Sequence, residues 1–269
     1  MMRALRSELT KLRRWSVLAG GAAMIIVPAA YAAFSLIRVT SSAKTAQTLA
    51  ILQTLSTAQG LTTMLAVSAS FATTIAIILV AANVAAEWSQ GTLRNLLVRE
   101  PRRLRLLAGK MLALLLYAIS CEALALLIGS AVALLVAQSH GLSITPWTSS
   151  EGMTAFFSFF GYSLFSIVGL SFLGMLTAVL TRSAAAAVGI TLAYALVGEV
   201  LIGAAWPDGA QWLPVHLFGY LTNSVTVAGG TGASAPPMGY GSDVLVALLW
   251  MVGFLVISAV VVRRRDVLA

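Results

Sequence analysis

The sequence predicts an all-α, polytopic membrane protein. Of its 269 residues, 59% are hydrophobic and only 10% are charged, whereas a soluble domain carries roughly 25% charged residues. The apolar residues also form six runs long enough to cross a bilayer. Because an open strand edge would leave backbone groups without hydrogen bonds in lipid, we expect each run to be a helix.

The predicted spans cover residues 15–37, 61–86, 106–137, 152–180, 184–206 and 243–262. Several exceed the ~20 residues needed to cross hydrocarbon, so we expect tilt or extension beyond the bilayer. No internal repeat is visible in the sequence. We therefore treat residues 1–269 as a single transmembrane domain.

Residues 1–14, before the first span, have an amphipathic pattern. Leu5, Leu9, Leu12 and Trp15 recur at helical spacing with basic residues between them. This pattern is typical of an interfacial helix that lies in the headgroup plane. A frayed basic tail is the alternative.

The basic start of the chain also resembles the head of a signal peptide, and Ala30-Tyr31-Ala32 resembles a cleavage site. However, the apolar run continues past that site to Ile37, and five more spans follow. We therefore expect the first span to be retained.

The lysines and arginines predict the orientation, because cytoplasmic loops of membrane proteins carry an excess of them. If both termini lie on one side, that side holds fifteen of the 17 Lys and Arg residues, and the other side holds only Arg38 and Lys44. We therefore expect both termini in the cytoplasm. The net charge of +8 then reflects the orientation of the chain in the membrane. Without an aromatic-studded basic groove, we expect no nucleic-acid partner.

The three segments predicted to lie on the outer side differ in character. Residues 38–60 are rich in Thr, Ser, Ala and Gln and are expected to be partly helical, and residues 138–151 form a short connection. Residues 207–242 are the longest of the three and include His216. We expect this segment to be an outer loop.

The inner loop over residues 87–110 is the most structured polar stretch. Leu93, Leu96 and Leu97 share one face of a short amphipathic helix. Gly91 permits a break at its start, and Pro101 ends or bends it. Such a helix would offer a docking element to a cytoplasmic partner. A solvated connector that obeys the positive-inside rule is the alternative, but it does not explain Gly91-Thr92 or the leucine stripe.

This loop resembles the signature of the type 2 ABC-transporter permease family. The resemblance covers nearly the whole chain, including the six spans. The residues that carry it are Glu87, Gly91-Thr92-Leu93-Arg94, Leu97, Pro101, Arg103 and Gly109-Lys110, with Ser7-Glu8-Leu9-Thr10-Lys11, Leu213-Pro214 and Arg264-Arg265-Asp266 elsewhere.

The resemblance implies the permease subunit of a bacterial exporter in the plasma membrane. Family members work as homodimers or heterodimers of six-span units, and each unit engages a separate cytoplasmic ATPase that binds ATP and Mg. The loop after the second span serves there as the coupling helix. The implied coupling residues here are Glu87, Gly91, Thr92, Leu93, Arg94, Leu97, Pro101, Arg103 and Lys110.

The chain has no G-x-x-x-x-G-K-[ST] motif. We therefore expect no enzyme activity and no bound cofactor in this chain, with ATP hydrolysis on a separate polypeptide. The single cysteine, Cys121, excludes an intramolecular disulfide and a cysteine-based zinc cluster. We expect no metal site.

Two acids, Glu122 and Glu199, fall within predicted spans. A carboxylate at this depth usually faces a cavity or a partner, and we expect no Lys, Arg or His at matching depth. One hypothesis is that they line a translocation route for a cationic or polar group. The alternative is that each is protonated and hydrogen-bonded to a neighbouring helix.

Hydroxyl residues in the second and fourth spans have the same two interpretations. These residues are Ser68, Ser70, Thr73, Thr74, Ser158, Tyr162 and Ser166. They could line a path, but small and hydroxyl residues more often let helices approach and bond. We therefore favour packing.

The same sequence bears on two other functions. An intramembrane serine enzyme at Gly169-Leu170-Ser171 needs a base within reach, and both histidines fall in predicted outer loops. A proton-coupled secondary transporter using Glu122 and Glu199 is the main alternative. Such folds usually show internal repeats or broken helices, and the sequence predicts neither.

Overall fold

The computed structural model describes residues 14–41, 46–90, 103–222 and 239–264. This part of the chain contains helices and turns but no strand, and six of its helices are long and apolar enough to cross a membrane. The predicted fold class is confirmed, and the chain is a multi-pass membrane protein. The predicted coupling helix after Gly91 lies outside the described residues, as does the interfacial helix except for Arg14.

These six helices coincide with the six predicted spans, and their ends lie within four residues of the predicted ones. The fifth span is built from three consecutive pieces, and a short helix follows the first span. In chain order the spans and this short helix are α2 (Trp15–Ser41), α3 (Ala46–Leu55), α4 (Gly60–Ser89), α6 (Arg103–Ser139), α7 (Ser150–Thr181), the fifth span made of α8 (Ala184–Ala193), η1 (Tyr194–Gly198) and α9 (Glu199–Ala205), and α12 (Tyr240–Arg264).

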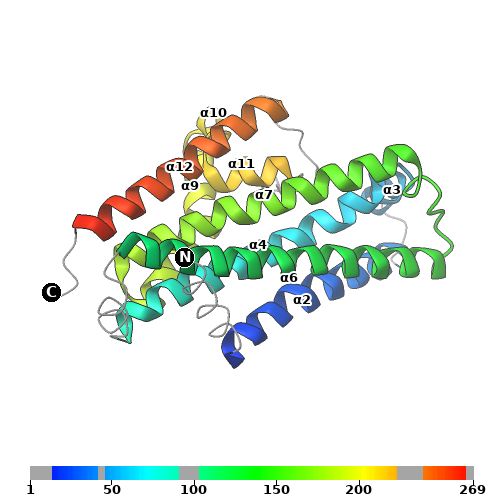
Figure 1. Ribbon diagram of the computed structural model, residues 1–269. Coiled ribbons are helices and arrows are strands. Elements are labelled where there is room, and N and C mark those ends of the chain that lie inside the picture. Colours follow the sequence, from blue (N-terminus) through cyan, green and yellow to red (C-terminus); the bar gives the residue numbers. More distant parts are fainter. Residues whose placement is uncertain (1–13, 42–45, 91–102, 223–238, 265–269) are drawn as a thin grey trace.

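The spans run alternately up and down, so their ends gather at two ends of an elongated bundle (Figure 1). At the left in Figure 1, α2 and α6 begin and α4, α7 and α12 end. We call this the basic end, because the residues that follow or flank these helix ends include several cations. The described cations there are Arg14, Arg105, Lys110, Arg182, Arg263 and Arg264.

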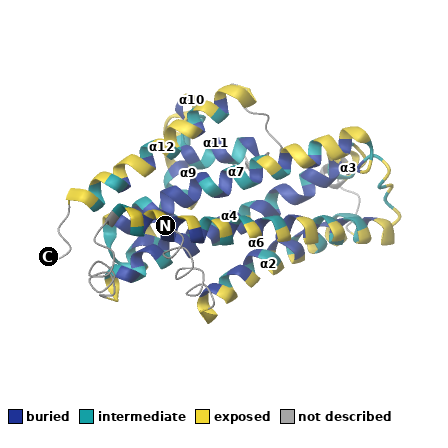
Figure 2. Ribbon diagram, in the orientation of Figure 1, coloured by how far each residue is buried: buried dark blue, intermediate teal, exposed yellow. Residues whose placement is uncertain are grey.

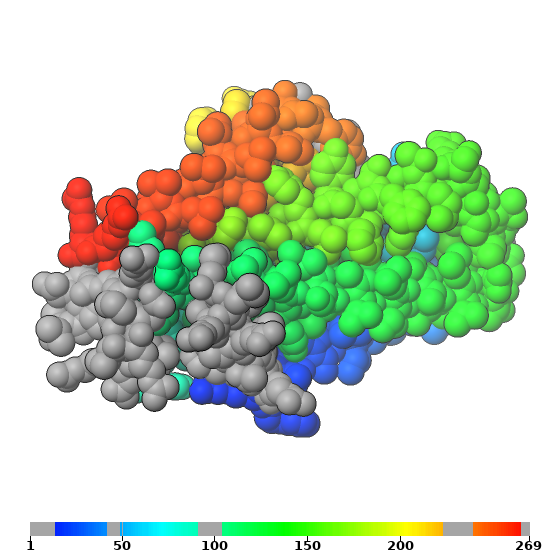
Figure 3. Space-filling model, viewed as in Figure 1, coloured from blue at the N-terminus to red at the C-terminus, as the bar shows by residue number. Residues whose placement is uncertain are grey.

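Helices α4 and α7 form the centre of the bundle. In their most apolar stretches 61% and 67% of the residues are buried, against 17% for both the fifth span and α12. Figure 2 shows the same contrast, with α12 largely exposed along its outer side. On the face seen in Figure 3, α6, α7 and α12 lie side by side. The outer spans therefore present apolar side chains to their surroundings, as expected in lipid.

The connection between α7 and the fifth span is very short. Arg182 ends α7 in the left-handed region, at φ 55°, and its N–H donates to the Ala178 carbonyl. Ser183 then caps α8, where its hydroxyl accepts from the Ala186 N–H at 3.4 Å. The buried hydroxyls of Thr177 and Thr191 lie 2.6 Å apart across the two helices. Hydroxyl residues of this kind let neighbouring helices approach and form hydrogen bonds.

The segment after the fifth span departs from the predicted outer loop. Residues 207–221 form α10 (Pro207–Ala210) and α11 (Pro214–Leu221). Leu217 and Phe218 on α11 are fully buried and belong to the same apolar core as α4 and α7. The expectation of an outer loop is therefore wrong for α11. Most residues of α11 are apolar, so the burial of this helix against α7 is favourable.

The fifth span is one continuous helix over Ala184–Ala205 that contains a π-helical turn. This turn, η1, lies between α8 and α9, directly before Glu199. Such turns inside α-helices occur frequently at functional sites. Glu199 lies next to the start of α11.

Candidate functional site

The two ends of the predicted coupling loop are joined by a buried ion pair. Glu87 lies in the last turn of α4, and Lys110 lies in the first part of α6. The Lys110 Nζ is 2.8 Å from the Glu87 Oε1, and the two side chains are only 8% and 9% exposed. This contact connects the ends of the two helices, and removing one partner would leave an uncompensated buried charge.

The remaining predicted coupling residues are less fully described. Arg103 is the first residue of α6. Gly91, Thr92, Leu93, Arg94, Leu97 and Pro101 lie outside the described residues. The loop therefore starts and ends at the basic end, between two helices that the Glu87–Lys110 pair connects.

Glu122 is fully buried at the contact between α6 and α7. Its Oε1 accepts a hydrogen bond from the Ser163 hydroxyl at 3.2 Å. Its Oε2 has no hydrogen-bond partner among the described residues. The hydrogen bond to another helix agrees with one of the two sequence hypotheses, but the protonation state and a role in translocation stay predictions.

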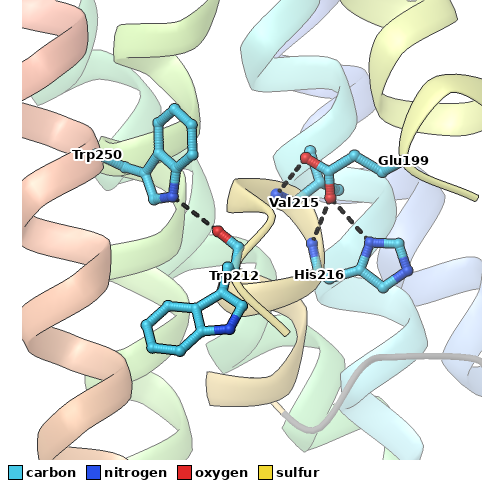
Figure 4. Close-up of polar contacts among 5 residues, drawn as sticks. All are labelled: Glu199, Trp212, Val215, His216 and Trp250. Atoms are coloured by element: carbon cyan, nitrogen blue, oxygen red, sulfur yellow. Dashed lines mark hydrogen bonds and ion pairs between the residues drawn. The ribbon is translucent and has the colours of Figure 1, made fainter. Parts of the chain in front are cut away.

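Glu199 binds the start of helix α11 through both carboxylate oxygens (Figure 4). Its Oε1 accepts from the Val215 N–H at 2.9 Å, and its Oε2 accepts from the His216 N–H at 2.8 Å. The His216 Nδ1 lies 2.8 Å from the same Oε2. A carboxylate is well suited to this position, because the first N–H groups of a helix lack partners within the helix and carry partial positive charge.

The sequence predicts no histidine at the same depth in the membrane as Glu199. This prediction is wrong, because His216 contacts Glu199. The outer loop predicted over residues 207–242 includes His216, which the structure places on α11. The pattern that identifies α11 is Leu213-Pro214 followed by an apolar run. Proline is favoured at the first helical position, and the structure places Pro214 there.

Helix α11 is fixed on its other sides as well. The Ser166 hydroxyl on α7 donates to the Phe218 carbonyl at 3.2 Å. The Phe218 ring packs directly over Gly169, where a Cβ atom would overlap the ring. The Trp250 Nε1–H on α12 donates to the Trp212 carbonyl at 2.8 Å, just before α11 (Figure 4).

A cavity of about 240 Å³ lies between α4, α7, the fifth span and α11. Four residues of the predicted hydroxyl set contribute to its wall, namely Ser70, Thr73, Thr74 and Ser166. Neither Glu122 nor Glu199 is among its lining residues. The prediction that these acids line a translocation route therefore gains no support from this cavity, and it stays a prediction.

Metal chemistry has no candidate in the part of the chain that the structure describes. No group of three or more His, Cys, Asp or Glu side chains there could hold a metal ion. Cys121 is buried in the apolar contact between α2 and α6.

Comparison with known proteins gives a family without a known activity. A family model described as "Protein of unknown function (DUF2705)" matches residues 24–268. No curated protein matches the chain.

Proposed function

The chain belongs to the DUF2705 family, and we propose that it is the permease subunit of an ATP-binding-cassette exporter. In this proposal a separate cytoplasmic ATPase binds ATP and Mg and docks on residues 87–110. The working unit is a dimer of permease subunits, identical or not, in the plasma membrane of a bacterium. Both termini then lie in the cytoplasm, because the basic end is the cytoplasmic end.

The observation that supports this proposal most strongly is the Glu87–Lys110 ion pair. A docking loop transmits force to two spans only if its ends move together. The pair connects α4 to α6 at the point where the loop leaves and rejoins the bundle. A passive connector would have no need of a buried ion pair, since a buried pair is often no more stabilising than apolar residues of similar volume.

One observation favours the alternative, a proton-coupled secondary transporter. The fifth span contains the π-helical turn η1 directly before the buried Glu199, and such turns are frequent at functional sites. However, both oxygens of Glu199 already bind the start of α11. A proton carrier has to release its contacts in each cycle, whereas these contacts hold a buried helix in place. We therefore favour the ATP-driven exporter.

Affinity purification from native membranes tests the proposal. We expect the tagged chain to co-purify with a polypeptide that carries the G-x-x-x-x-G-K-[ST] motif, identified by mass spectrometry. Transport activity of the purified chain without such a partner, or transport driven by a proton gradient alone, would contradict the proposal and support the alternative.

Charge variants test the role of the ion pair. We expect Glu87→Gln to reduce ATPase capture and ATP-driven transport about tenfold or more, because it leaves Lys110 buried without its carboxylate. The exchange Glu87→Lys with Lys110→Glu is expected to restore part of the loss. The matched control is Glu151→Gln in the exposed first turn of α7, at the opposite end of the bundle. Equal ATPase capture and transport by Glu87→Gln and Glu151→Gln would show that the ion pair has no role in coupling.

A further inference from the structure

The cavity between α4, α7, the fifth span and α11 lies at the level of the middle of the bundle. It is lined by residues near the centres of α4 and α7, such as Thr73 and Ser166. An apolar cavity of about 150 Å³ holds one benzene molecule. By the same measure, a cavity of about 240 Å³ holds a chain of roughly ten carbon atoms.

The cavity wall combines apolar and polar side chains, and it has no acidic, lysine or arginine side chain. The polar ones are Ser70, Thr73, Thr74, Ser166, His216 and Thr222. The hydroxyls of Ser70 and Thr74 donate to carbonyls of their own helix, at 3.2 and 2.8 Å. The Ser166 and Thr222 hydroxyls donate to the Phe218 carbonyl, and the His216 Nδ1 lies 2.8 Å from the Glu199 Oε2. These groups therefore already have partners within the protein, and a charged ligand group would meet no opposite charge to compensate for its lost hydration.

The opening of the cavity is apolar. Leu196 and Val200 belong to its lining and yet are 60% and 50% exposed on the outer side of the fifth span. Exposed apolar residues at this level of a spanning helix face hydrocarbon. A ligand therefore reaches the cavity sideways from the lipid, through an opening that favours apolar groups.

The inner wall of the cavity is fixed by contacts that involve no ligand. Glu199 binds the start of α11, and the Phe218 ring packs over Gly169. Because this wall is already fixed, ligand binding does not have to order it. A pre-formed site therefore loses less conformational entropy on binding and binds more tightly.

We propose that this cavity is a binding site for the hydrocarbon tail of a membrane amphiphile that enters sideways from the bilayer. The tail occupies the cavity between α4 and α11, and the polar head stays outside it. The identification of this amphiphile as cargo rests on the proposed exporter function. The binding itself requires only this chain.

Photolabelling of the purified full chain tests the site without any ATPase. The chain is reconstituted in phosphatidylethanolamine–phosphatidylglycerol vesicles that contain a fatty acid with a diazirine near the end of its chain. After illumination, mass spectrometry locates the labelled residues. We expect enrichment at Ser70, Thr73 and Thr74 relative to exposed positions such as Leu249, and competition by unlabelled fatty acid.

A matched pair of variants separates the cavity from the general lipid surface. Ser70→Phe fills the cavity, whereas Ser120→Phe makes the same change at an exposed position of α6 whose hydroxyl also donates to the carbonyl four residues earlier. We expect Ser70→Phe to lower the cavity labelling about tenfold, a loss equivalent to burying roughly two methylene groups, and Ser120→Phe to leave it unchanged. If Ser70→Phe does not fold, Thr74→Leu narrows the same cavity with a smaller change.

Two results would overturn the proposal. One is uniform labelling of all exposed spans without enrichment at the cavity, which indicates lipid contact only. The other is labelling at the cavity that neither Ser70→Phe nor Thr74→Leu reduces in folded protein. Failure to capture an ATPase would affect only the exporter function, because the labelling requires no partner.

Discussion

Gly169 on α7 allows a close approach of α11, because the Phe218 ring occupies the space that any larger side chain would need. Small residues have this use throughout membrane proteins, where helices gain stability from close packing rather than from exclusion of water. At Gly21 on α2, an added Cβ would likewise overlap the Tyr117 side chain, whose hydroxyl donates to the Val17 carbonyl at 2.9 Å. Single positions of this kind decide which helix faces can meet.

We expect Gly169→Ala to destabilise the protein by about 1–3 kcal/mol, because the added methyl group forces Phe218 and α11 to shift. Thermal unfolding of the purified protein in one detergent measures the change. The control is Gly161→Ala on the same helix, where an added Cβ meets no atom within 4 Å. That change should be neutral or should stabilise α7 by up to about 1 kcal/mol. Equal melting temperatures for the two variants would show that α11 does not depend on this contact.

Helix α11, at eight residues, is too short to be stable by itself, since isolated helices below roughly 12–15 residues are marginal in water. Its stability comes from its surroundings. Pro214 starts the helix, Glu199 accepts two of its first N–H groups, and the buried side chains of Leu217 and Phe218 join the core. The element therefore depends on Glu199 more than a long span depends on any one residue.

We expect Glu199→Gln to loosen α11. The carboxylate has two charged oxygens that accept hydrogen bonds from the helix, whereas the glutamine side chain has only one oxygen, and that oxygen is neutral. Hydrogen bonds to charged groups contribute about 1.5–3 kcal/mol each, so amide hydrogen exchange at Val215 and His216 should accelerate by at least about tenfold. Hydrogen exchange followed by mass spectrometry measures it. Glu151→Gln, in the exposed first turn of α7, is the control and should leave α11 unchanged. Unchanged exchange at α11 in Glu199→Gln would refute this dependence.

The whole bundle has two chemically different ends. Arg14, Arg105, Arg182 and Arg263 lie at the basic end, whereas Arg38 lies in the last turn of α2 at the other. The up-and-down order of the spans is what collects cations from distant parts of the chain at one end. The positive-inside rule predicts that this end faces the cytoplasm, the side on which the docking loop of the proposed exporter has to lie.

Cysteine labelling tests the orientation. Cys121, the only cysteine, is replaced by alanine, and single cysteines are introduced at His140 and Arg263, which are exposed at opposite ends of the bundle. A membrane-impermeant maleimide added to intact cells should label His140→Cys and leave Arg263→Cys unlabelled, and permeabilised cells should label both. The reverse pattern would invert the orientation and would place the 87–110 loop away from any cytoplasmic ATPase.

Much of the fold could be predicted, but much less of the site. The six spans were found because each is a long apolar run that stands out without reference to any other part of the chain. Glu87 and Lys110 were selected from the sequence as parts of one loop, but their contact was not predicted. Helix α11 was not predicted because it has only eight residues and contains Pro214 and Gly219, residue types that are common in turns. His216 was misplaced along with it.

The sequence by itself determined the number of spans and their approximate ends, because crossing hydrocarbon requires only enough consecutive apolar residues. The tertiary structure decided the π-helical turn before Glu199, the position of α11 within the bundle and the cavity to whose wall α11 contributes. These features depend on how each helix is rotated and which faces meet. In a span that is apolar on nearly every side, the sequence pattern carries little information about that rotation.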